Sequence, residues 1–217
     1  MSPERCDGIL LAAGAGRRYG MPKVLAEDGR WLRGAVAALR DGGCARIFVV
    51  FGATGPAYRA PDGTWQVSQI SGISLPAGVR PVWASDWDLG LSASTRAGLA
   101  AAATPGLGIR QAVDQGGEPA ELVTIMPVDT PDVGPAVVER VITAARASAS
   151  RLARAFFGTT PGHPVVLGRA HWAGVCASAA GNSGAGTYLR QRADMVCVTC
   201  DDLATGIDRD YPADSAL

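Results

Sequence analysis

Three glycines and three cations stand close together near the start of the chain, in a stretch that could bind phosphate. They are Gly14, Gly16, Gly20, Arg17, Arg18 and Lys23. Glycine lets a ligand approach backbone N–H groups closely, and those groups with flanking cations suit a phosphate chain. Lys23 is the only lysine of the chain, whereas arginine is frequent. Because lysine is a movable point charge and arginine a rigid fork, this exception favours a phosphate-binding role for Lys23, against the alternative of a plain connecting turn.

Two common phosphate-binding motifs are excluded here. A Rossmann fingerprint needs G-x-G-x-x-G, but Gly20 comes one residue too late after Gly14 and Gly16. A Walker loop needs Gly-Lys followed by Ser or Thr, and the chain has no such run.

Carboxylates occur at two further places where they could hold a cation. Asp129 follows an apolar run and lies between Pro127 and Pro131, and Asp208 and Asp210 form a D-x-D pair near the end of the sequence. Mg²⁺ in phosphoryl-transfer sites usually takes one or two carboxylates together with substrate phosphates. Asp129 could instead be the N-terminal cap of a helix at 133–147. Asp208 and Asp210 could instead belong to a solvated acidic tail.

Alternating apolar runs and helical patterns predict the elements that must position these groups. Strands are expected at 8–12, 46–51, 79–83, 121–126, 154–157, 162–167 and 195–199. Helices are expected at 31–39, 133–147 and 187–192, and a further helix is expected to begin in the second half of 84–99 and to run to about residue 103. Strand, helix and strand in succession predict a right-handed crossover with parallel strands. We therefore expect a single α/β domain over residues 1–217, with a mostly parallel sheet, Rossmann-like βαβ units and ligands at the carboxyl ends of the strands.

Composition narrows the class of protein. The net charge is zero, the cations are dispersed, and no apolar run approaches the roughly 20 residues of a membrane span. We expect a cytoplasmic protein that binds neither nucleic acid nor membrane. The five cysteines predict no disulfide framework, and Cys197 and Cys200 are interpreted as ordinary buried thiols, with a redox pair as the alternative. Residues 53–78 stay unassigned, and 104–120 is predicted to be a surface loop.

The loop resembles the L-A-A-G-x-[SG]-x-R-x-G-x-x-K-x-L motif of nucleotidyltransferases of the molybdenum cofactor type. The matching residues are Leu11, Ala12, Ala13, Gly14, Gly16, Arg18, Gly20, Lys23 and Leu25. This resemblance implies the nucleotide-diphospho-sugar transferase fold. It also implies that the loop residues Leu11 to Gly16, Ala15 included, bind a nucleoside triphosphate together with Arg18 and Lys23.

Four further motifs of the same family follow in the correct order. Trp87, Gly90, Leu91, Ser94, Gly98 and Leu99 match W-x-x-G-[ML]-x-x-S-x-x-x-G-L. This match implies that Ser92 and Ser94 contact the base or ribose, although either serine could instead cap the helix. The family's D-x-P motif implies that Asp129 binds the divalent cation, Mg²⁺ or Mn²⁺. The ending typical of the family is matched at Asp208, Asp210, Pro212 and Asp214. It implies a second metal ligand, with Asp208 preferred and Asp210 as the next choice.

The acceptor end matches less completely. Gly162 and His163 match G-H-P-[VA], so His163 is expected to orient or bind the acceptor and not to carry protons, and His171 to pack. Asn182 and Gly186 replace the acid and the arginine of G-D-x-G-A-R. Asn182 is nevertheless expected at the acceptor.

The resemblance implies transfer of a nucleoside monophosphate to a phosphorylated acceptor with release of pyrophosphate. Catalysis would rest on Lys23, Arg18 and Asp129. Ala13 favours CTP over GTP, since the guanylyl branch has glycine there. The acceptor would be molybdopterin or its molybdenum form, and a molybdenum hydroxylase would receive the product. The alternatives are a cytidylyl- or sugar-phosphate nucleotidyltransferase with another acceptor, or a carrier that binds a nucleotide or cofactor without catalysis.

Overall fold

A seven-stranded sheet forms the centre of the computed structural model, which describes residues 4–69, 72–104 and 120–211. Its strand order is β5-β2-β1-β6-β8-β7-β9. The strands are β1 (Cys6–Leu11), β2 (Ile47–Phe51), β5 (Val79–Trp83), β6 (Leu122–Pro127), β7 (Leu152–Phe157), β8 (Thr160–Gly168) and β9 (Val196–Thr199). Only β8 runs against its neighbours β6 and β7, and the other pairs are parallel. The predicted α/β fold with a mostly parallel sheet is confirmed.

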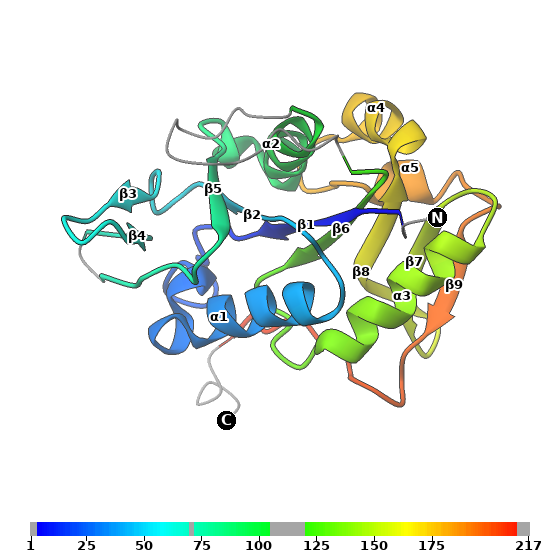
Figure 1. Cartoon of the computed structure of the whole chain (residues 1–217), viewed down its shortest axis with the longest axis horizontal. Helices are drawn as coiled ribbons and strands as arrows, with labels where there is room; N and C mark the ends of the chain where they lie inside the picture. The colour runs from blue at the N-terminus through cyan, green and yellow to red at the C-terminus, as the bar shows by residue number, and fades with distance from the viewer. Residues whose placement is uncertain (1–3, 70–71, 105–119, 212–217) are drawn as a thin grey trace.

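Helices cover both faces of this sheet (Figure 1). On one face lie α1 (Ala26–Asp41) and α3 (Pro135–Ala147), and on the other lie α2 (Leu91–Ala103), α4 (Arg169–Ser178) and the short α5 (Gly186–Leu189). Each face has its own apolar core, one around Leu10, Leu32 and Met126, the other around Ile9 and Leu99. Neighbouring residues of one strand, such as Ile9 and Leu10, thus pack into opposite layers, as expected for a sheet covered on both sides.

Three helices differ in detail from the sequence-based expectation. The regular part of α1 begins at Arg30, because Glu27, Asp28 and Gly29 have positive φ. It ends at Asp41, two residues beyond the predicted end, with Gly42 as its C-cap. α3 begins at Pro135, with Gly134 as its N-cap. The predicted helix at 187–192 is wrong at its end: α5 stops at Leu189, because the N–H groups of Gln191 and Arg192 bond three residues back in turns.

The segment that the sequence left unassigned contains a small antiparallel hairpin, β3 (Tyr58–Arg59) and β4 (Trp65–Gln66), apart from the main sheet. The cysteines within the described residues are free thiols, as predicted. Cys200 is buried as expected, but the expected burial of Cys197 is wrong, because its side chain is exposed. Most of the predicted surface loop, 105–119, and the motif residues Pro212 and Asp214 lie outside the described residues. None of the helices in the described part of the chain has the length and apolar character to cross a membrane.

Candidate active site

The glycine-rich loop leaves the carboxyl end of β1 and closes on itself. The Gly20 N–H donates to the Gly16 carbonyl at 2.8 Å. Gly16 has a φ of +59°, and a Cβ there would collide with the backbone of Met21. Gly14 is different, because a Cβ placed on it would meet nothing within 4 Å. The fold itself therefore requires glycine at 16, whereas at 14 the glycine leaves open space over the backbone.

Lys23 opens a short 3₁₀ turn, η1 (Lys23–Leu25), that is fixed by the fully buried Val24. Its Nζ lies 2.7 Å from Asp129 Oδ2 and 2.8 Å from Asp210 Oδ1. Only 13% of the Lys23 side chain is exposed. Burial lowers the pKa of Lys23, but the hydrogen bonds to the two carboxylates outweigh it, so its pKa lies above the ordinary value. The ammonium is therefore charged at neutral pH and fixed between two acids.

Asp129 reaches this point because β6 pairs in parallel with β1, with Pro127 opposite Leu11. The chain continues in register for one more residue, since the Val128 N–H donates to the Leu11 carbonyl at 3.1 Å. Asp129 Oδ2 bonds to Lys23, while Asp129 Oδ1 is buried without a hydrogen-bond partner. The alternative of a helix cap is wrong, because Gly134 caps α3 and no side chain bonds there.

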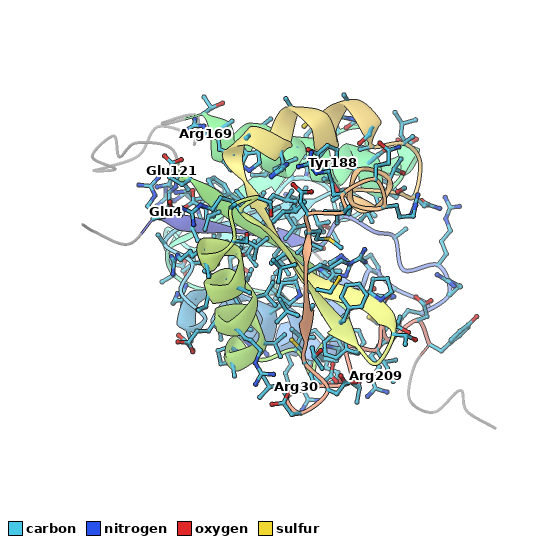
Figure 2. The ribbon with its side chains drawn as sticks, turned by 90° about the vertical axis from the view of Figure 1, so that its right-hand side faces the viewer. Glu4, Arg30, Glu121, Arg169, Tyr188 and Arg209 are labelled. Carbon is cyan, nitrogen blue, oxygen red and sulfur yellow. The ribbon has the colours of Figure 1, made fainter. Side chains whose placement is uncertain are left out.

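The last described segment, residues 201–211, crosses the carboxyl ends of the central strands, and we call it the C-terminal strap. Asp132 Oδ2 accepts from the N–H and the hydroxyl of Thr205, and the Arg209 N–H donates to the Asp129 carbonyl at 2.9 Å. Figure 2 shows Arg209 far from Glu4 and Glu121, which flank the amino ends of β1 and β6. The strap thus brings both acids of the D-x-D pair to the ligand-binding end of the sheet.

The two acids of the D-x-D pair differ in their surroundings. Asp210 places Oδ1 on Lys23 and Oδ2 on Arg18, the latter at 3.0 Å. The hydrogen bond from Lys23 lowers the pKa of Asp210. Burial and then the charge of Asp129 raise the pKa of Asp208. Asp208 and Asp129 are therefore close enough to repel each other, whereas Asp210 is held by cations.

A second wall comes from the turn before α2. The 3₁₀ turn η2 (Trp87–Leu89) ends at Gly90, whose φ is +103°. A Cβ on Gly90 would lie 2.7 Å from Asn182 Oδ1, so the loop that carries Asn182 packs directly on this turn. Gly90 is the N-cap of α2 without a side-chain bond, so neither Ser92 nor Ser94 caps the helix.

These walls enclose a cavity of about 490 Å³. The predicted site residues that line it are Leu11, Ala12, Ala13, Gly14, Ala15, Gly16, Arg18, Lys23, Ser94, Asp129, Asn182 and Asp210. Ser92 does not line it: the Ser92 hydroxyl is buried and accepts a hydrogen bond from Arg96 at 3.3 Å. Asp208, Gly162 and His163 are also outside the lining. Asn182, expected at the acceptor, shares the cavity with the predicted phosphate loop.

His163 lies on β8, which runs antiparallel to β6 with Val165 opposite Ile125. His163 precedes Val165 by two residues, so it lies toward the carboxyl end of β6. Burial, with a smaller effect of the Arg154 charge, lowers the pKa of His163 to about 4. His163 is neutral at pH 7. His171 instead bonds to the Tyr188 hydroxyl and the Ser150 carbonyl and is buried, so its predicted packing role is confirmed.

Several lining residues were not predicted as site residues. Arg17, Tyr19, Trp87, Asp88 and Leu91 also line the cavity. Trp87 and Leu91 belong to a motif that pointed to this place. Asp88 lies inside the same motif at a variable position, so its sequence carried no separate signal. Tyr19 packs against Trp31, with ring centroids 5.2 Å apart, which a sequence pattern does not reveal.

The carboxylates at the site fit a divalent cation only in part. Asp129 offers a buried oxygen without a partner, and its repulsion with Asp208 would be relieved by a cation between them. Within 4–69, 72–104 and 120–211, no three Asp, Glu, His or Cys side chains are grouped as a metal site. The donor set therefore resembles the Mg²⁺ sites in which one or two carboxylates share the ion with substrate phosphates.

Comparison with known proteins identifies the family. Residues 8–196 match the family described as MobA-like NTP transferase domain. A relative from Paenarthrobacter nicotinovorans, named nicotine blue oxidoreductase, is 32% identical in an alignment that covers 94% of this chain and 91% of the relative.

Solved structures share the fold. A homologue of Rv0371c from Mycobacterium sp. strain JC1 superposes with a TM-score of 0.70 at 22% identity, over 95% of this chain and 91% of the other. Rv0371C of Mycobacterium tuberculosis in complex with manganese gives 0.62 at 18%, over 98% and 94%. Molybdopterin-guanine dinucleotide biosynthesis protein A of Archaeoglobus fulgidus gives 0.55 at 15%, over 91% and 85%.

Proposed function

The chain belongs to the MobA-like NTP transferase family and is a nucleotidyltransferase, and we propose that it transfers a nucleoside monophosphate, CMP in preference to GMP, to a phosphorylated acceptor. The observation that carries the proposal is the position of Lys23. The only lysine of the chain projects from the glycine-rich loop into the cavity and meets Asp129 there.

The loop would bind the triphosphate. Gly14 leaves open space over the backbone of the loop, and Arg18 and Lys23 line the same cavity. An oxygen of the acceptor phosphate would attack the α-phosphorus, the bond from that phosphorus to the bridging oxygen would break, and pyrophosphate would leave with the bonding electrons. Such a reaction needs positioning and neutralisation of charge more than covalent help from the protein. Arg18 and Lys23 would neutralise charge, and the backbone N–H groups of the loop would position the phosphates.

Asp129 and Asp208 would hold a divalent cation, Mg²⁺ or Mn²⁺. The unpartnered Asp129 oxygen and the raised pKa of Asp208 support this pair over Asp210, whose two oxygens bond to cations. When bound, the cation would neutralise charge on the phosphate oxygens. The manganese named for the mycobacterial neighbour supports a divalent ion without deciding between the two metals.

Ser94 and the Trp87–Gly90 turn would contact the base or ribose. Ala13, which resembles the cytidylyl branch, supports CTP. Ser92 would act indirectly, because its hydroxyl bonds to Arg96. Three further properties stay predictions: a cytoplasmic location, molybdopterin as the acceptor, and a molybdenum hydroxylase as the recipient of the product.

Gly162, His163 and Asn182 would serve the acceptor. Asn182 lines the cavity, whereas His163 lies on β8 outside the lining, toward the carboxyl end of β6. As a neutral imidazole at pH 7, His163 could donate or accept a hydrogen bond without adding charge. The molybdopterin-related neighbour supports a pterin acceptor, at the level of its name alone.

The experiment is pyrophosphate release with each nucleoside triphosphate, molybdopterin and Mg²⁺. We expect Lys23→Ala and Asp129→Ala to lower turnover at least about tenfold, which corresponds to roughly 1.4 kcal/mol of lost transition-state stabilisation. Asp194→Asn is the matched control, because it removes a carboxylate from a surface pair with Arg192 outside the cavity. Circular dichroism checks that the variants fold. Full activity in both site variants would refute the assignment.

The name of the 32% identical relative supports a second candidate, a redox reaction on an organic pigment. The two functions are separable with one preparation. Loss of pigment colour with NADH or NADPH, without pyrophosphate release from any nucleotide, would favour the redox reaction. A panel of sugar phosphates beside molybdopterin tests the alternative of a different acceptor.

A further inference from the structure

Asp210 has a contact pattern that the proposed reaction does not use. One oxygen of its carboxylate lies 2.8 Å from Lys23 Nζ, and the other lies 3.0 Å from an Arg18 guanidinium nitrogen. These are the two cations that flank the glycine-rich loop. A carboxylate that bridges two cations with one oxygen each makes the contacts that two oxygens of a phosphate group would make.

The same two cations cannot serve Asp210 and a phosphate chain equally well. Lys23 has three donors and already gives one to Asp129 and one to Asp210. Its side chain is only 13% exposed, so little room is left around Nζ. A phosphate group that approaches Lys23 would also meet the negative charge of Asp210 at close range. The carboxylate must therefore move before phosphate takes its place.

The strap allows this movement because it is fastened at other points. Asp132 holds Thr205, and the Asp129 carbonyl holds the backbone of Arg209. Gly206 packs against the Phe157 ring. None of these contacts involves the Asp210 side chain, which is 34% exposed. A rotation of that side chain toward solvent would leave the rest of the strap in position.

We propose that Asp210 is an internal competitor of the substrate: its carboxylate occupies the place of a phosphate group on Lys23 and Arg18, and an incoming polyphosphate displaces it. This inference rests on the proposed function, since it concerns the same phosphate site. It gives Asp210 a role in nucleotide affinity separate from that of a metal ligand. The empty site keeps its two cations paired, and only a ligand with enough negative charge at this spacing replaces the carboxylate.

The test is the dissociation constant of inorganic triphosphate and of CTP, measured by calorimetry with EDTA present so that no metal contributes. We expect Asp210→Asn to bind both about fivefold more tightly than the wild type, because the loss of the ion pairs with Lys23 and Arg18 removes the competition. Asp202→Asn is the matched control. It removes the same charge from the same strap, but its partner Arg140 is on the surface and not in the cavity. We expect it to bind within twofold of the wild type.

Asp210→Glu keeps the charge and serves as the second variant, with binding expected close to the wild type. Unchanged or weaker binding by a folded Asp210→Asn variant would overturn the inference and leave the nucleotide site intact. If neither the wild type nor any variant binds triphosphate or CTP, the proposed phosphate site itself is overturned, and the inference with it.

Discussion

At the scale of single residues, the site is organised by charges that hold one another in place. Lys23 lies between Asp129 and Asp210, and Arg18 holds the second oxygen of Asp210. Partly buried pairs of this kind fix side-chain geometry more than they add stability, because desolvation offsets much of the Coulomb attraction. The arrangement therefore positions the ammonium for a ligand.

His163 provides a prediction about pH. Its pKa in the folded protein is about 4, below its ordinary value of 6.5. Between these values the unfolded chain takes up a proton that the folded chain does not. The free energy of unfolding therefore falls as the pH is lowered through 6.5 toward 4. We expect His163→Gln to lose less stability than the wild type between pH 6.5 and 4.5, by up to about 2 kcal/mol, measured by urea unfolding at both pH values.

The loss of stability between the two pH values is measured within each protein. A change of stability that the substitution causes equally at both pH values therefore does not affect the result. Equal losses in both proteins would show that the pKa of His163 is the same in the folded and unfolded chains, so that burial does not lower it.

Residue types predicted which residues of the glycine-rich loop line the cavity, because glycine and a single lysine have few other reasons to occur together. Twelve of the predicted residues line one cavity. The pairing of Asp210 with Lys23 and Arg18 could not be predicted, because it joins residues 187 positions apart through the path of the strap. Ser92 was misplaced for a local reason. Ser92 and Ser94 are neighbours in the sequence pattern, but a helix turns them about 200° apart.

At the scale of elements, glycines decide how closely helices approach the sheet. Gly98 of α2 faces β1, and a Cβ there would lie 2.5 Å from Ile9 Cγ2. Gly34 of α1 has nothing within 4 Å of such a Cβ and is exposed. The two glycines have the same intrinsic cost in a helix, so the difference between them reports packing alone.

We expect Gly98→Ala to lower the free energy of unfolding by about 1–3 kcal/mol, since overpacking outweighs the gain in helix propensity. Gly34→Ala should raise it by about 0.5–1 kcal/mol. Chemical denaturation of both variants measures the pair. Stabilisation by Gly98→Ala would contradict the close packing of α2 on β1.

The strand pattern was predictable because buried strands of a parallel sheet are continuous apolar runs. The β3–β4 hairpin was not, since its strands are two residues long and show no periodicity. The end of α5 was missed because turns continue the local hydrogen bonding beyond the helix.

At the scale of the whole molecule, the sheet has two parts that meet at β6. On one side β1, β2 and β5 run parallel to β6 and carry the glycine-rich loop and the Trp87 turn. On the other side β8 runs against β6 and carries Gly162 and His163. This division suits an enzyme that binds two substrates across one edge of a sheet.

We therefore expect His163→Ala to separate the two binding events. CTP with Mg²⁺ at about 100 times its dissociation constant should raise the melting temperature by about 5–10 °C in the wild type. His163→Ala should keep this rise and lower the rate of transfer to the acceptor. The variant's melting curve and its pyrophosphate release give the two readouts. Loss of the CTP effect would place His163 with the nucleotide.

The single lysine has a further, practical consequence. Besides any terminal amine, the chain has one primary amine, and it is located in the cavity between Asp129 and Asp210. Reagents that couple to amines, whether cross-linkers, fluorophores or activated surfaces, therefore have no harmless lysine to modify. The amount of reagent coupled to Lys23 would measure how many molecules have an accessible cavity. A bound ligand would be detected because it reduces that amount.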